Sequence, residues 1–339
     1  MLVPVVAIAL ALGLGGIMIF FAGINPLAAY QEMMKGAFGN IRGIGETLTR
    51  FVPLLFCGLA FSVAFKAGFY NVGAEGQLYM GAVGALLVGL YAPPMPGVLL
   101  IGLGLLSSFF FGAVWLGLSG WMKWKFGANE IINTMMQNYL AILAVELLLK
   151  GALRDSQGLM DQSPVIQAGA VIPYMFAGLR VSYALPMALL AAVLMYVLLN
   201  KTTVGYELRM LGKNVRVARY AGVSLLKTTV ITVLLSGGLA GMAGGLELLG
   251  TQFRLMPGFS PGYGFDAIGV AVMAKHNPFA SILTALLFSV IRVGAGAMQR
   301  SLGVPLPLLS IIQGMIIVFV ICSDYLSRRI NATRIGGRA

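Results

Sequence analysis

Residues 201–227 read KTTVGYELRMLGKNVRVARYAGVSLLK and separate two long apolar runs. The stretch carries six cations against the single anion Glu207, which gives it a net charge of +5. Because cytoplasmic loops of membrane proteins collect Lys and Arg, this loop is predicted to lie inside the cell. That placement orients every other segment of the chain.

Two short helices are predicted within this loop, over Gly205–Leu211 and Asn214–Ala221, with a break near Gly212 and an end at Gly222. Short helices across the inner mouth of a helical bundle suit contact with a soluble partner. The alternative is a solvated basic loop that touches anionic lipid head groups. Charge alone does not decide between the two.

The composition of the 339-residue chain is that of an integral membrane protein. Hydrophobic residues make up 59% and charged residues only 10%, whereas soluble proteins average roughly 25% charged residues. The 45 glycines fit helical spans whose backbones approach closely, while a membrane barrel would show short alternating segments. The fold class is therefore predicted to be all-α.

Several function classes lack the residues that they need. The net charge of +12 gathers at the ends of apolar runs, where membrane topology explains it, so no nucleic-acid site is expected. Cys57 and Cys322 lie inside apolar runs without metal-ligand spacing, and His276 is the single histidine. Neither a metal nor a cofactor is expected.

Ten apolar runs can serve as membrane crossings, of which the eighth is short. They are residues 2–21, 49–65, 77–91, 97–118, 131–149, 182–199, 228–249, 266–274, 278–297 and 304–322. With residues 201–227 inside the cell, both the N-terminus and the C-terminus fall on the cytoplasmic side. The sequence thus predicts one polytopic transmembrane domain over residues 1–339.

Two segments predicted to lie outside the membrane are more than short connections between spans. Residues Pro26–Thr47 mix apolar and charged positions and are predicted to form an amphipathic helix at the outer interface. Residues 150–181 form the longest external loop, with enough apolar residues to fold back on the bundle. This loop could receive an extracytoplasmic partner or be a plain connector.

The seventh apolar run carries glycines at four-residue spacing. Gly237, Gly241 and Gly245 share one helical face, and small residues at this spacing let a second helix approach closely. Packing within one bundle is favoured over a contact between subunits, although the spacing itself fits both.

Polar residues at membrane depth are candidates for a translocation path, because such residues usually face a bundle interior or a hydrated path. Glu75 lies in the glycine-broken stretch 73–77, flanked by Asn71 and Gln77, and a broken helix is a pointer to a transport site. Asn138 adds a further amide. Uncharged amides suit a neutral polar solute, and hydrogen bonding between helices is the alternative use of each.

Four motifs run through most of the chain. They are FYNVGAEGQL at 69–78, NEII at 129–132 with Asn138-Tyr139, GKN at 212–214 with RYAG at 219–222, and GYGFD at 262–266. In these motifs the sequence resembles the membrane subunits of bacterial ATP-binding-cassette (ABC) importers for nucleosides and simple sugars. That group also holds the branched-chain amino-acid and ribose permeases. Val215, Val217 and the run 274–277 depart from the usual pattern, which has Pro, Ala and Gly-Arg-Asn there.

The resemblance implies that residues 201–227 contain coupling helices, which fit a groove on a cytoplasmic ATP-binding subunit. The residues expected to make this contact are Arg209, Lys213, Asn214, Arg216, Arg219 and Tyr220. It also implies a second permease subunit, different or identical, an extracytoplasmic solute-binding protein, and a place in the bacterial inner membrane. The sequence contains no G-x-x-x-x-G-K-[ST] phosphate loop, so ATP hydrolysis is expected on the partner.

The function predicted from these observations is the translocation path for a nucleoside or a related small polar solute, with Asn71, Glu75, Gln77 and Asn138 near the path. A sugar or branched-chain amino-acid permease is the nearest alternative. A secondary transporter or channel would need a coupling-ion site, and inverted repeats are not evident. A membrane enzyme would need paired carboxylates, histidines or metal ligands.

Overall fold

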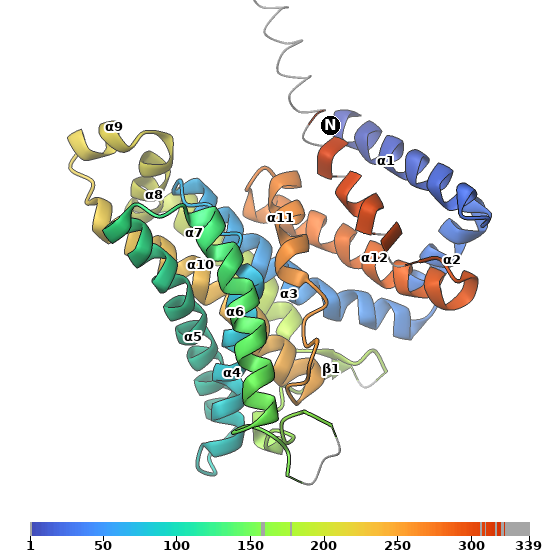
Figure 1. The fold of residues 1–339 in the computed structure, drawn as a ribbon, viewed down its shortest axis with the longest axis horizontal. Helices are drawn as coiled ribbons and strands as arrows, with labels where there is room; N and C mark the ends of the chain where they lie inside the picture. The colour runs from blue at the N-terminus through green and yellow to red at the C-terminus, as the bar shows by residue number, and fades with distance from the viewer. Residues whose placement is uncertain are drawn as a thin grey trace, which may run out of the picture. The chain divides into compact units, whose positions relative to one another are not determined.

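The computed structural model describes residues 2–156, 160–176, 178–305, 307–308, 310–315, 317–319 and 322. The chain divides into two compact units, one over 48–285 and one that combines 1–47 with 286–339. The larger unit contains α4 (Ala74–Tyr91), α5 (Gly97–Phe126), α6 (Glu130–Lys150), α7 (Ala184–Lys201), α8 (Thr203–Lys213), α9 (Val215–Tyr220), α10 (Leu225–Glu247) and α11 (Tyr263–Met273). In Figure 1 their colours follow the order of the chain.

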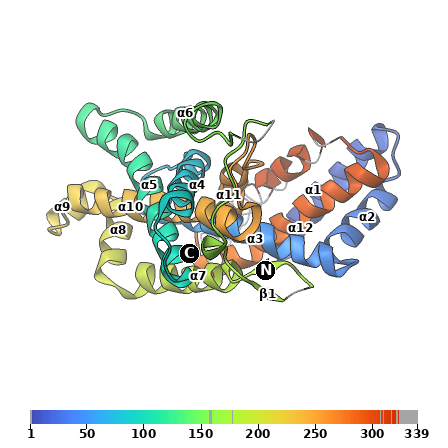
Figure 2. The ribbon, with the colours of Figure 1, turned by 90° about the horizontal axis from the view of Figure 1, so that it is seen from below.

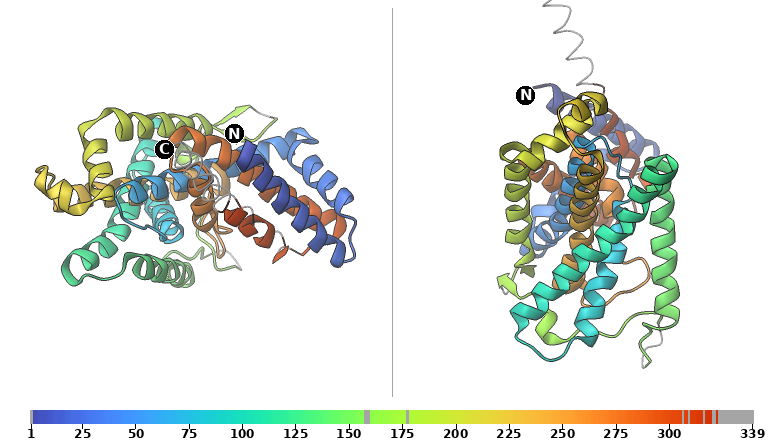
Figure 3. Two further views of the ribbon diagram at one scale, coloured as in Figure 1. Left: turned by 90° about the horizontal axis from the view of Figure 1, so that it is seen from above. Right: turned by 90° about the vertical axis from the view of Figure 1, so that its left-hand side faces the viewer.

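The smaller unit is built from α1 (Leu2–Phe21), α2 (Pro26–Phe38) and the adjoining ends of α3 (Ile41–Lys66) and α12 (Pro278–Leu302). The axes of α1 and α2 differ by 116°. Asn25 caps α2 by accepting a hydrogen bond from the backbone N–H of Leu27 at 2.9 Å. A Cβ on Gly36 would lie 2.2 Å from the Cβ of Ala297, so α2 packs closely on α12; the two run side by side in Figure 3.

The amphipathic helix predicted over residues 26–47 is divided in the structure. α2 ends at Phe38 and α3 begins at Ile41, earlier than the predicted span at residue 49. The side chain of Asn40 accepts a hydrogen bond from the backbone N–H of Gly43 at 2.6 Å, which satisfies an N–H of the first turn of α3. The predicted single helix is therefore wrong, because a local capping residue starts a new helix.

The core of the larger unit is α4, which lies between α5 and α11 in Figure 2 and also contacts α6 and α10. Nearly all of its residues are buried. A Cβ on Gly81 would lie 2.1 Å from the carbonyl oxygen of Gly241, and a Cβ on Gly237 would lie 2.6 Å from that of Gly112. The glycines of α10 thus let α4 and α5 approach backbone to backbone, which confirms packing within the bundle.

Six helices among the described residues are long and apolar enough to cross a membrane: α3, α5, α6, α7, α10 with its π-helical extension η2 (Leu248–Gln252), and α12. The bent pair α1 and α2 gives a seventh when it counts as one span. α4 carries Glu75 and Gln77 and is enclosed by protein, so its sequence is less apolar. The chain is a multi-pass membrane protein.

The loop over residues 150–181 contains a short hairpin, so the fold is mainly but not wholly helical. Strand β1 (Tyr174–Phe176) pairs antiparallel with β2 (Val181–Ser182), after the 3₁₀ turn η1 (Ala168–Ala170). The backbone N–H of Ile172 donates to the carbonyl of Leu249 at 2.8 Å. Together with further bonds of this kind from Ser163, Ile166 and Gln167, this contact confirms that the loop folds back on the bundle.

The turn between α11 and α12 places two residues in the left-handed region. Lys275 has φ 51° and His276 has φ 56°, at the place where the sequence departs from the Gly-Arg-Asn run. The His276 ring stacks on Phe65, with 3.8 Å between centroids. Burial, followed by the nearby charge of Lys66, lowers the pKa of His276 from 6.5 to about 4.

This pKa predicts how stability depends on pH. Between pH 6.5 and about 4 the unfolded chain takes up a proton at His276 that the folded chain does not. We therefore expect stability to be highest above pH 6.5 and to fall as the pH drops through this window. His276→Asn, which keeps a residue that tolerates a left-handed backbone, should lose this part of the pH dependence of the thermal midpoint in detergent. An unchanged profile in the variant would contradict the assignment.

Candidate functional site

The connection between α3 and α4 is a break in the helical structure at the centre of the larger unit. Residues Ala67–Gly73 are not helical, and Phe69 and Asn71 within them are buried. Buried backbone groups without helical partners must find hydrogen bonds elsewhere. The break predicted at residues 73–77 thus lies earlier in the structure, because residues 74–77 already belong to α4 and only Gly73 is shared. The polar side chains around the observed break supply its partners.

Asn71 and Gln77 form a reciprocal amide pair. The Asn71 Nδ2 donates to Gln77 Oε1 at 2.9 Å, and Gln77 Nε2 donates to Asn71 Oδ1 at 2.8 Å. Asn71 Nδ2 also donates to the Ser236 hydroxyl of α10 at 2.8 Å, and Asn71 Oδ1 accepts from the Gly73 N–H at 3.0 Å. The Ser236 hydroxyl in turn donates to the carbonyl of Ala60 in α3 at 2.8 Å. The pair thus joins the break to three helices.

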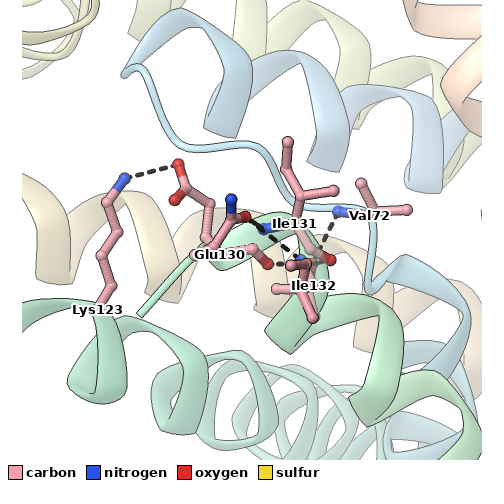
Figure 4. A network of polar contacts seen from close by, with 7 residues as sticks. Val72, Lys123, Glu130, Ile131 and Ile132 are labelled. Carbon is pink, nitrogen blue, oxygen red and sulfur yellow. Dashed lines mark hydrogen bonds and ion pairs between the residues drawn. The ribbon is translucent and has the colours of Figure 1, made fainter. Parts of the chain in front are cut away.

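Asn138 and Thr134 connect the same break to α6. Asn138 Nδ2 donates to the carbonyl of Val72 at 3.0 Å, while its Oδ1 accepts from the Gly76 N–H at 2.8 Å. The Val72 N–H donates to the Thr134 hydroxyl at 3.2 Å, and Figure 4 shows this N–H directed at the first turn of α6. Both backbone groups of Val72 are therefore held by side chains of one helix.

Glu75 lies at a different contact, between α4 and α11. Its side chain is 2% exposed, and Oε2 accepts a hydrogen bond from the Gly264 N–H at 2.6 Å. Gly264 belongs to the first turn of α11, where the positive end of the helix dipole favours a carboxylate. A Cβ on Gly264 would lie 2.2 Å from the Glu75 nitrogen, so only glycine allows this approach.

The structure brings Asn71, Gln77 and Asn138 into one network and places Glu75 at a separate helix terminus. All four are buried and form hydrogen bonds in this conformation. Hydrogen bonding between helices is the alternative that the sequence allowed for the amides. Their position near a translocation path stays a prediction. The hydroxyl of Thr134 was not singled out from the sequence. Its position four residues before Asn138, on the same helical face, is the signal that could have found it.

An ion pair fixes the start of α6 beside the break. Lys123 Nζ lies 2.7 Å from Glu130 Oε1 (Figure 4) and 5.0 Å from the centroid of the Phe69 ring. Asn129 caps the helix by accepting a hydrogen bond from the Ile131 N–H at 2.9 Å. Lys123 therefore ties the end of α5 to both α6 and the break.

The basic loop forms the two short helices α8 and α9, as predicted. The break between them falls at Asn214, close to Gly212, and the Asn214 side chain accepts hydrogen bonds from Arg216 N–H at 2.9 Å and Val217 N–H at 3.2 Å. Asn214 thereby caps α9. Gly222 has φ 80° and follows the end of that helix.

The residues predicted to contact an ATPase lie on the surface, apart from the half-buried Arg209, whose Nε donates to the Gly205 carbonyl at 3.3 Å. Arg216, Arg219 and Tyr220 project from α9, and Tyr220 is 94% exposed. The exposed residues Lys213 and Asn214 join this surface. Within the described part of the chain, no ion pair neutralises Lys213, Arg216 or Arg219.

The end of α8 touches the break itself. A Cβ on Gly212 would lie 2.2 Å from the carbonyl oxygen of Lys66, and a Cβ on Gly68 would lie 3.1 Å from the Cα of Gly212. Gly68 also has φ 73°. A movement of α8 would therefore press directly on the segment that leads to Asn71, and no local sequence signal predicts this contact.

The fold has the parts of a membrane transport subunit. It is a multi-pass helical bundle that contains a hydrogen-bonded break between two helices and carries an exposed pair of basic helices. Residues 43–321 match the model of the family described as "Branched-chain amino acid transport system / permease component". The match covers most of the chain, which therefore belongs to this family of permease components.

Relatives of known name resemble the chain over nearly its whole length. The guanosine ABC transporter permease protein NupP of Bacillus subtilis is 34% identical over 95% of this chain and 93% of the relative. The glucose ABC transporter permease protein TsgB13 of Haloferax volcanii is 34% identical over 96% and 88%. The nucleoside ABC transporter permease protein NupB of Lactococcus lactis is 31% identical over 94% and 90%. The chain is thus a permease subunit of an ABC transporter, in which a separate subunit hydrolyses ATP.

Two substitutions test the path prediction. Asn71→Ala leaves the Gln77 amide and the Gly73 N–H without their partner, and we expect it to cost about 1 to 3 kcal/mol and to lower solute uptake. Glu75→Gln keeps an acceptor for the Gly264 N–H, so we expect reduced uptake with little change in the thermal midpoint. Asn133→Ala is the control, because among the described residues the Asn133 side chain bonds only the Met122 sulfur. Normal uptake by both variants at normal expression would show that the prediction is wrong.

Proposed function

We propose that the chain forms the translocation path of an ABC importer for nucleosides, together with a second permease subunit. The observation that carries this proposal is its similarity to the guanosine permease, which extends over 95% of this chain and 93% of that relative. Uncharged amides around the break are compatible with a neutral solute rich in hydrogen-bonding groups. A zwitterionic branched-chain amino acid would instead need charged partners.

A sugar is the second candidate. The glucose permease of Haloferax volcanii is also 34% identical, and a sugar is likewise neutral and rich in hydroxyl groups. A nucleoside differs from it by its planar base, which can stack on aromatic rings. Both solutes fit the chemistry of the amides, so the choice between them depends on transport measurements.

The proposed topology has ten spans with both termini in the cytoplasm of a bacterial cell and the chain in the inner membrane. The net charge of +5 in residues 201–227 supports the cytoplasmic location of α8 and α9. On this assignment the loop 150–181 lies outside, where a solute-binding protein delivers the solute. The chain acts as one transmembrane domain, with crossings supplied by α4, α11 and the residues after 303 as well as by the longer helices.

The proposed mechanism runs through the contact between α8 and the break. ATP binding on two ATPase subunits moves α8 and α9, whose exposed cations meet the ATPase surface. Gly212 transmits this displacement to Gly68, since their backbones touch. The segment that carries Asn71 then changes its position against α6 and α10, and access to the path alternates between the two sides of the membrane.

Competition measurements separate the candidate solutes. Uptake of radiolabelled guanosine by cells that express the assembled importer should be reduced by excess unlabelled nucleosides and not by glucose, ribose or leucine. A matched strain without this chain supplies the background. If radiolabelled guanosine does not enter above the background of that strain while radiolabelled glucose or ribose does, the permease assignment stands and the nucleoside proposal is wrong.

A further inference from the structure

Two adjoining hollows lie at the end of α5 that faces α8. The first is an apolar groove of about 380 Å³ between α5 and α10, two helices that contact each other along the larger unit (Figure 1). Its walls include Phe110, Trp121, Leu226, Val230 and Leu234. Its walls are almost wholly apolar, so the groove suits a hydrocarbon chain.

The second hollow is a cavity of about 510 Å³ whose wall is partly polar and partly apolar. Its polar side chains are Lys123, Lys213, Asn214, Tyr70, Thr229 and Thr232. Both hollows are also lined by Gly120, Trp124 and Thr229. Because they share these residues, the apolar groove continues into the more polar cavity, and an amphiphilic molecule could occupy both.

The mouth between the two hollows is positively charged. Lys125 Nζ lies 5.2 Å from the centroid of the Trp121 ring, which forms part of the groove. Lys213 lines the cavity. Within the described part of the chain neither lysine forms an ion pair, whereas Lys123 is neutralised by Glu130. An anionic group beside Trp121 would thus meet the available ammonium group of Lys125.

The aromatic residues place this mouth at the depth of the lipid head groups. Trp121 and Trp124 are both largely exposed near the C-terminal end of α5. Tryptophan is enriched at the membrane interface, where one side of the indole is apolar and the other is wet. Lys125 extends over the rings of Trp121 and Phe126, as a lysine does when its ammonium reaches toward the head groups.

We infer that this site binds an anionic phospholipid of the cytoplasmic leaflet. One acyl chain occupies the groove between α5 and α10, and the phosphate lies at the mouth beside Lys125. Basic pockets between transmembrane helices on the cytoplasmic side have the charge that such head groups require. The inference depends on the proposed orientation of the loop 201–227 in the membrane, and not on which solute is transported.

The alternative to a lipid is that a second permease subunit covers the groove between α5 and α10. The second permease subunit over the mouth would bury Lys125, and burial of an unpaired ammonium group is unfavourable. A phosphate instead neutralises it. Because Lys213 lines the second hollow and is the last residue of α8, a lipid that also reaches this hollow would contact the helix that the proposed mechanism moves.

Filling the groove tests the acyl-chain part of the site. A Cβ on Gly117 would meet only Val233 Cγ1, at 4.0 Å, so Gly117→Leu places a side chain in the groove without a backbone clash. Gly102→Leu is the matched control, since it lies on the same helix, has no atom within 4 Å of its Cβ and does not line the groove. Native mass spectrometry of the assembled importer, purified in detergent and titrated with phosphatidylglycerol, measures the bound lipid. We expect a several-fold lower occupancy for Gly117→Leu alone.

Removing the charge tests the head-group part. Lys125→Gln should weaken phosphatidylglycerol binding about fivefold and leave phosphatidylcholine binding nearly unchanged. Lys201→Gln, in the basic loop but outside both hollows, should have no such effect. Equal lipid occupancy in Gly117→Leu and Gly102→Leu, or no preference for the anionic lipid, would overturn the inference. A disulfide between Trp121→Cys and a cysteine on the second permease subunit would overturn it as well, and none of these outcomes depends on solute uptake.

Discussion

Gly241→Val is expected to remove most of the correctly folded protein. A Cβ at Gly241 would lie 2.2 Å from the carbonyl oxygen of Ser108 and 2.9 Å from the Cα of Gly112. These are backbone atoms of α5, so the contact is relieved only by moving a whole helix. Overpacking of this kind costs about 1 to 3 kcal/mol or more, and α10 also touches α4 at the same level through Gly81. Size-exclusion chromatography in mild detergent should show a large loss of the monodisperse fraction.

Gly102→Val is the control for this experiment. It makes the same change on a membrane-spanning helix, but no atom lies within 4 Å of the new Cβ, so folded yield should stay near that of the parent chain. Equal yields from Gly241→Val and Gly102→Val would show that the close approach of α10 to α4 and α5 does not hold the bundle together.

Arg219→Glu is expected to abolish most ATP-driven uptake while the protein still inserts and folds. The side chain is exposed and has no partner among the described residues, whereas α9 is held by Ala218 packed against Leu211 and Val223. Charge reversal should therefore spare the helix and disturb only its contact with an ATPase. Because a charged pair at a protein interface is lost, we expect solute uptake to fall roughly tenfold or more. The measurement is solute uptake at matched membrane expression, together with ATPase stimulation by the solute-binding protein.

The matched control is Lys201→Glu, the same charge reversal in the same loop but at the end of α7 and outside the predicted contact residues. It should retain most of the uptake. Undiminished ATP-driven uptake in Arg219→Glu would contradict the role assigned to α9, and equal losses in both variants would indicate a general effect of loop charge.

Local sequence signals predicted the elements that depend on neighbouring residues. Glycines on both sides of Glu75 indicated a break close to it, although the break ends at Gly73 and Glu75 lies in α4. The four-residue spacing of Gly241 with its neighbours indicated a close helix contact. The basic loop was correctly divided into two helices. Each of these features follows from backbone freedom, helical period or charge, which are properties of short stretches.

Such signals could not predict contacts between residues that are far apart in the sequence. The bond between Glu75 and Gly264 joins residues 189 positions apart, and that between Asn71 and Ser236 joins residues 165 apart. Neither partner has a pattern that marks it. The start predicted for the second helix of the basic loop, Asn214, is the residue whose side chain caps α9.

The central proposal is that this chain forms the path of an importer that is driven by ATP on a partner subunit. The most direct measurement is radiolabelled nucleoside uptake in cells that lack the chain and in the same cells with the gene restored. Each strain is measured with ATP depleted and, separately, with the membrane gradient dissipated by an uncoupler while ATP is maintained. We expect uptake to vanish on deletion, to return with the gene, to stop on ATP depletion and to survive the uncoupler. Uptake that stops with the uncoupler at constant ATP would contradict this account and indicate a secondary transporter.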